Sequence, residues 1–112
     1  HFQNGYYYFR NIGNRVLLGG GRNLDFKTEE TTQSVLTQLV QTKLEEMLAT
    51  IILPNQNYQI EQRWSGIMGL GPQKKPIIKQ ISNNVCCAVR LGGMGVAIGW
   101  LVGEEAARLL LE

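Results

Sequence analysis

The stretch that decides the fold of this chain is VRLGGMGVAIG, residues 89–99. It follows an apolar run at residues 85–89, which predicts a buried strand, and it opens a helix rich in small residues. A strand, a glycine turn and a helix N-terminus direct backbone N–H groups toward an anion or an electron-rich ring. Too few residues follow Gly95 for the second strand of a complete dinucleotide-binding unit. The turn is therefore either a packing turn or the last part of a cofactor site that begins elsewhere.

The composition is that of one small globular domain. Hydrophobic residues make up 44% of the 112 residues and charged residues 18%, which is too apolar for a disordered chain. The net charge of +2 disfavours nucleic-acid and membrane partners, including an RNA-binding domain that would stack bases on residues 6–9. The 13 glycines gather at residues 19–21, 66–71 and 92–99, so they mark specific turns.

The cysteines and the histidine suggest no chemistry of their own. Cys86 and Cys87 are neighbours in a predicted strand, where adjacent side chains point to opposite faces and cannot be bridged without distortion. We find no secretory signal and no apolar run of roughly 18 residues, so we expect reduced thiols in a cytoplasmic protein without a membrane span. With His1 as the only histidine, we propose no metal site and no catalytic triad.

The first half of the chain predicts a β-hairpin followed by a long helix. Residues 5–10 and 15–20 have strong strand preference, and residues 11–14 between them tolerate a tight turn. From residue 32 to residue 53 the apolar positions recur at helical spacing, with Pro54 closing the pattern. A single apolar face indicates that this amphipathic helix packs on a sheet.

The second half predicts three strands and a last helix. Residues 58–64 alternate between apolar and polar, residues 76–81 form a short strand, and residues 85–89 are apolar throughout, which suits a strand covered on both faces. The last helix spans about residues 95–110 and contains Gly99 and Gly103. Each helical glycine costs about 1 kcal/mol relative to alanine, so we expect a close contact to compensate. The prediction is one compact α+β unit with a mainly antiparallel sheet.

Several blocks of this sequence, taken in order, resemble the C-terminal part of a family of flavin-dependent oxidoreductases, the D-amino-acid oxidase and glycine oxidase superfamily. The blocks are residues 7–10 with 16–21, residues 63–66, residues 75–78 and residues 84–96. The resemblance implies that residues 1–84 belong to a substrate domain and that residues 85–112 complete an FAD domain. The N-terminal part of that FAD domain is missing here. We therefore expect an excised fragment with little FAD affinity of its own, which can dimerise through exposed apolar surface.

The resemblance also implies two groups of site residues. The turn faces the flavin ring near its pyrimidine end, through Gly92, Gly93, Met94, Gly95 and Val96. Arg63 falls where many members bind the substrate carboxylate, although here Trp64 follows it in place of a proline. Arg90 and Leu91 stand where many members have Gly-His. Arg63 is therefore either a substrate ligand or a structural ion-pair residue for Glu61 or another carboxylate.

The function implied is oxidation of a small amine or amino acid by hydride transfer to FAD. In such a reaction the cofactor carries the chemistry, so no catalytic side chain is required, and the sequence shows none. The alternative is a self-contained, non-catalytic α+β binding or interaction module, in which the glycine turn binds a simple anion or nothing.

Overall fold

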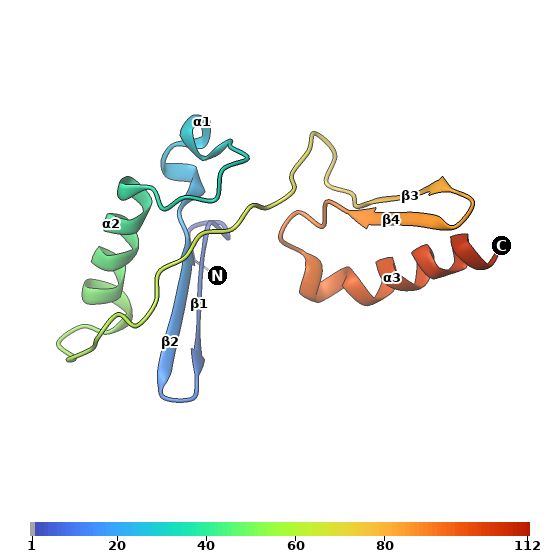
Figure 1. The fold of residues 1–112 in the computed structure, drawn as a ribbon. Coiled ribbons are helices and arrows are strands. Elements are labelled where there is room, and N and C mark those ends of the chain that lie inside the picture. The colour runs from blue at the N-terminus through green and yellow to red at the C-terminus, as the bar shows by residue number, and fades with distance from the viewer. Residues whose placement is uncertain (1) are drawn as a thin grey trace. The chain divides into compact units, whose positions relative to one another are not determined.

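Residues 2–112 are described by a computed structural model, drawn in Figure 1 from blue at the N-terminus to red at the C-terminus. The predicted α+β class is confirmed, with two small antiparallel sheets and a C-terminal helix. The chain forms two units, His1–Ile67 and Met68–Glu112, where we expected one. The assignment of residues 1–84 and 85–112 to a substrate domain and an FAD domain stays a prediction.

The predicted N-terminal hairpin is confirmed. Strand β1 (Tyr7–Ile12) pairs antiparallel with β2 (Arg15–Gly20), from Tyr7 opposite Gly20 to Ile12 opposite Arg15. Their connection is Gly13 and Asn14 alone, shorter than the four residues expected. Gly13 has a φ of 59°, which suits a tight two-residue hairpin turn.

The core of the first unit lies between this hairpin and helix α2 (Gln38–Met47), which contacts β2 (Figure 1). Tyr7 on the hairpin is 0% exposed and Met47 on the helix is 1% exposed. Gly21 follows β2 and lies close to the side chains of Val40 and Tyr7. The core therefore holds the helix on the hairpin, as its apolar face predicted.

The helix begins later than its periodicity predicts, and this prediction was wrong for residues 32–37. The chain first forms a 3-10 turn, η1 (Arg22–Leu24), and a short helix, α1 (Phe26–Glu29). The Thr31 hydroxyl then accepts a hydrogen bond from the Gln33 N–H, and the Thr37 hydroxyl donates to Glu29 at 2.6 Å. The Thr31 contact offers the backbone an alternative to helix, and the Thr37 contact connects the residue before α2 to Glu29 of α1, so α2 starts at Gln38. It continues into a π-helical turn, η2 (Leu48–Ile52).

The strand predicted at residues 58–64 is absent from the structure, which shows no helix or strand between residues 56 and 71. The segment is fixed to its own unit by ion pairs: Glu61 with Arg15 at 3.1 Å, and Arg63 with Glu45 at 2.8 Å. Alternation predicts an extended chain, but a strand also needs a backbone partner. This segment has side-chain partners in place of a ladder.

The second unit is a hairpin with a helix along it (Figure 1). Strand β3 (Ile77–Ser82) pairs antiparallel with β4 (Val85–Val89), and α3 (Gly95–Leu111) contacts both. These elements confirm the strands and the last helix predicted from the sequence. Val102 of α3 is buried at this contact. The expectation that β4 is covered on both faces was wrong, because Val85 and Val89 are exposed.

The glycines of α3 differ from expectation as well. A Cβ placed on Gly99 or Gly103 meets nothing within 4 Å beyond the helix's own backbone, so no close contact compensates for them in residues 2–112. The exposed side of the helix presents large apolar side chains, with Val96 and Trp100 the first two. Within the part of the chain that is described, no helix has the length and apolarity needed to cross a membrane.

Candidate functional site

The turn between β4 and α3 depends on two successive glycines. Gly92 has a φ of 60° and Gly93 a φ of 85°, a backbone region that glycine adopts without steric cost. The N–H of Met94 donates to the carbonyl of Leu91 at 3.0 Å and closes the turn. The chain thereby reverses at the end of β4 and enters α3 with Met94 as the N-cap residue.

The start of α3 leaves backbone donors open. The N–H groups of Ala97 and Ile98 both donate to the Met94 carbonyl at 3.0 Å, and no side chain caps the helix. The N–H groups of Gly95 and Val96 have no acceptor among residues 2–112. Two free donors at the positive end of a 17-residue helix favour a negative or electron-rich group.

The surface around these donors is apolar and open. Val96 is 103% exposed, and Met94 beside it is exposed as well. Gly92 and Gly93 carry no side chains of their own, and the side chains of Met68 and Leu70 lie against them. The open N–H groups of Gly95 and Val96 thus lie beside exposed apolar side chains.

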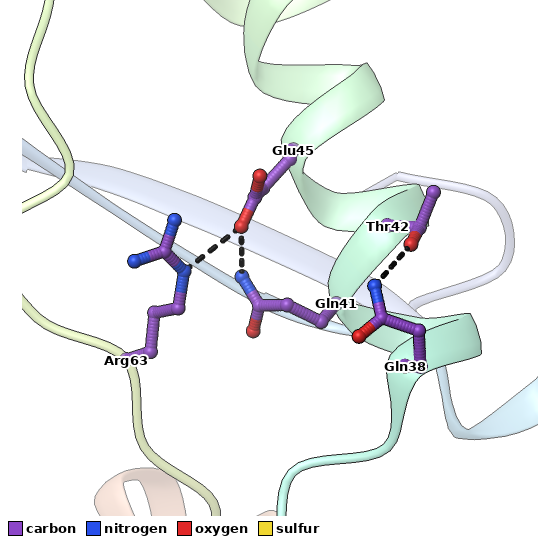
Figure 2. Close-up of polar contacts among 5 residues, drawn as sticks. All are labelled: Gln38, Gln41, Thr42, Glu45 and Arg63. Atoms are coloured by element: carbon purple, nitrogen blue, oxygen red, sulfur yellow. Dashed lines mark hydrogen bonds and ion pairs between the residues drawn. The ribbon is translucent and has the colours of Figure 1, made fainter.

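Arg63 belongs to the first unit, where it forms an ion pair (Figure 2). Its Nε donates to Glu45 Oε1 at 2.8 Å, and the Gln41 side-chain amide donates to the same oxygen at 2.7 Å. Glu61, the partner named first from the sequence, pairs with Arg15. The carboxylate that pairs with Arg63 is therefore Glu45, which lies one turn after Gln41 on α2.

The ion pair occupies only one edge of the guanidinium. The Arg63 side chain is 42% exposed, and Nη1 and Nη2 have no partner within the described part of the chain. These two nitrogens form the edge that binds a carboxylate through two parallel hydrogen bonds. Glu45 therefore orients Arg63 without using that edge. Its role as a substrate ligand stays a prediction.

The contacts of Glu45 lower its pKa below the ordinary value of 4.5, first through the Gln41 hydrogen bond and then through Arg63. A carboxyl with a lowered folded pKa stabilises the fold above its unfolded pKa, and this contribution is lost as the pH falls through the folded pKa. We expect Gln41→Ala to raise the Glu45 titration midpoint, measured by NMR of the side-chain carboxyl. Gln38→Ala is the matched control, because Gln38 bonds Thr42 instead (Figure 2). An unchanged midpoint in Gln41→Ala would contradict this assignment.

Gly92, Gly93 and Met94 form the turn, and Gly95 and Val96 begin α3; the assignment of these five residues to a flavin site stays a prediction. Arg63 lies in the other unit and is described there. Arg90, which departs from the family pattern, was not predicted as a site residue. Its φ of 61° is unusual for a residue other than glycine, and no local sequence signal announces it.

Comparison with known proteins supports the resemblance seen in the sequence. The chain matches the family described as FAD dependent oxidoreductase over residues 1–109. Neither a comparison with curated proteins nor one with solved structures returned a match. The family match covers nearly the whole chain and includes the glycine turn and most of α3. On this ground the chain belongs to the FAD dependent oxidoreductase family.

Proposed function

We propose that this chain is the C-terminal part of an FAD-dependent oxidoreductase that oxidises an amine or an amino acid, and that its glycine turn forms one wall of the flavin site. Family membership supports the cofactor and the reaction class. The observation that carries the site is the pair of open N–H groups, Gly95 and Val96, directly after a glycine turn.

The residues present fit a flavin. When bound, flavin supplies the acceptor for a hydride that leaves a carbon next to nitrogen. The open N–H groups and the positive end of α3 stabilise negative charge that develops on the ring. The positive φ values of Gly92 and Gly93 set the direction in which the chain enters α3 and presents these N–H groups. These residues bind, orient and polarise, and none of them needs to act as an acid or a base.

Arg63 is the residue we propose for the substrate carboxylate. Its Nη edge is open while Glu45 and Gln41 hold the Nε side in place. A guanidinium fixed in this way binds a carboxylate with little loss of side-chain freedom. An amino acid would use this edge, whereas a simple amine would not.

The cofactor proposal is tested on the whole natural protein. We expect a yellow protein with flavin absorbance, and a folded but colourless protein would favour the non-catalytic module instead. Gly95→Val is expected to lower FAD affinity by about tenfold, near 1.4 kcal/mol, because side-chain bulk would stand in front of the open N–H groups. A Cβ on Gly95 would lie 3.4 Å from Leu91 Cδ1, an ordinary contact, so the fold should survive. Gly103→Val is the matched control on the same helix.

Arg63→Lys tests the substrate proposal, because lysine keeps the charge and loses the planar fork. We expect KM for an amino acid to rise by about tenfold and KM for the corresponding amine to change little, since only the former has a carboxylate. Steady-state kinetics of the whole enzyme with both substrates measures the difference. Equal changes for the two substrates would show that Arg63 is only a structural partner of Glu45.

A further inference from the structure

In the second unit a glycine-rich loop, residues 68–71, lies against the turn that follows β4. A Cβ on Gly93 would lie 3.2 Å from Met68 Sδ, and one on Gly92 would lie 3.9 Å from Leu70 Cδ2. Two apolar side chains of the loop thus cover the two glycines of the turn. Met68 and Leu70 are both exposed, so this contact lies at the surface beside the open end of α3.

Arg90 makes the reciprocal contact, from the turn to the loop. A Cβ on Gly69 would lie 3.5 Å from Arg90 Cα, and one on Gly71 would lie only 2.5 Å from Arg90 Nη1. A side chain at residue 71 would therefore collide with the guanidinium. The glycines of the loop leave the room that Arg90 occupies.

The guanidinium is anchored beyond the loop, at a residue just before β3. Arg90 Nε and Nη2 both donate to the carbonyl oxygen of Lys75, at 3.2 and 2.9 Å. Hydrogen bonds from a charged donor are stronger than those between neutral groups. One side chain thus connects the end of β4, the loop and the residues just before β3.

The backbone conformation of Arg90 is unfavourable, and the contacts of its side chain offset that cost. A φ of 61° is unfavourable for any residue with a Cβ, and glycine would adopt it freely. The contacts with Gly71 and Lys75 are what the arginine gains at this position. The strain and the contacts occur two residues before the glycine pair, where they set the direction in which the turn leaves β4.

We propose that Arg90 is a positioning residue for the flavin site. By fixing residues 68–75 against the turn, it holds the open N–H groups of Gly95 and Val96 in one direction. This inference rests on the proposed function, because the group that those N–H donors face is taken to be the flavin. It predicts that loss of the Arg90 contacts changes how the flavin is held.

Two variants of the whole flavoprotein break the contact from opposite sides. Arg90→Gly removes the guanidinium and also relieves the strained φ, while Gly71→Ala keeps the arginine and fills its place. We expect both to speed amide exchange in residues 68–75 and to raise the FAD dissociation rate by about tenfold to a hundredfold. Arg90→Lys should show exchange and dissociation rates between those of the two variants and the wild type. The flavin reduction potential should be lower than that of the wild type in all three variants. Gly103→Ala, in open space on α3, is the control.

The outcomes separate this inference from the proposed function. If the wild-type protein holds no FAD, the proposed function fails and the positioning role fails with it. If the wild type holds FAD and Arg90→Gly releases it at the wild-type rate with an unchanged potential, only the positioning role is overturned. Faster exchange in residues 68–75 without any change in the flavin would show that Arg90 braces the loop and nothing more.

Discussion

Gly93→Val is expected to remove the flavin from the whole protein almost completely. Gly93 has a φ of 85°, and a Cβ there would lie 3.2 Å from Met68 Sδ. A β-branched residue resists this backbone conformation, so the turn must move and redirect the start of α3. A displacement of about 1 Å in an active site lowers the reaction rate by about a hundredfold, and we take the same scale for the loss of flavin contacts. We expect FAD affinity to fall by at least that factor, measured by flavin titration.

The control for this prediction is the same substitution at Gly66, which has no positive φ and no atom within 4 Å of its Cβ position. Gly66→Val should retain FAD as the wild type does. Because Gly93→Val also strains the backbone and can destabilise the fold, circular dichroism of the same samples shows whether the protein is still folded. A folded Gly93→Val protein with wild-type FAD affinity would show that the turn does not contact the cofactor.

Gly20→Val is expected to destabilise the first unit severely. Gly20 pairs with Tyr7 and has a φ of 118°, and a Cβ there would lie 2.0 Å from the Tyr6 carbonyl oxygen. Neither the strained φ nor the collision can be relieved without breaking the strand pairing beside the buried Tyr7. We expect a loss of about 3 kcal/mol or more in the free energy of unfolding, measured by chemical denaturation.

Gly66→Val again serves as the control, because it lies in the same unit and in open space. Its expected effect is within about 0.5 kcal/mol of the wild type. Since the hairpin supports α2, and α2 carries Glu45, loss of the hairpin should also release Arg63. A Gly20→Val protein as stable as the wild type would contradict the hairpin register described above.

The parts of the fold that were predictable are those that depend on local pattern. The β1–β2 hairpin, strand β4 and helix α3 follow from strand preference, a continuous apolar run and helical spacing, and the structure has all three. The start of α2 was missed because the Thr31 hydroxyl accepts from the Gln33 backbone and the Thr37 hydroxyl donates to Glu29, and apolar spacing reveals neither contact. The strand predicted at residues 58–64 is absent for a different reason. A strand needs a partner strand to hydrogen-bond with, and the alternation of apolar and polar residues does not indicate whether one exists.

The candidate site also has one part that was predictable from the sequence and another that was not. The glycine turn was predictable because its chemistry lies in the backbone of consecutive residues. The partner of Arg63 was not, because Glu61 is nearer along the chain, and only the fold brings Glu45 to the guanidinium. The Arg90 contact with Lys75 likewise depends on the path of the loop between them. The partner of neither arginine is evident from the sequence. The folded structure shows that Arg63 pairs with Glu45 and that Arg90 donates to the Lys75 carbonyl.

The most direct test of the central claim is amide hydrogen exchange at Gly95 and Val96 in the whole protein, with FAD bound and after FAD is removed. Both N–H groups lack an acceptor within residues 2–112, so any protection must come from outside this part of the chain. If the turn faces the flavin, exchange at both amides slows by about tenfold or more when FAD binds, while Gly103 on the far part of α3 is unchanged. Equal exchange at Gly95 and Val96 in the two states would contradict the placement of the flavin at this turn.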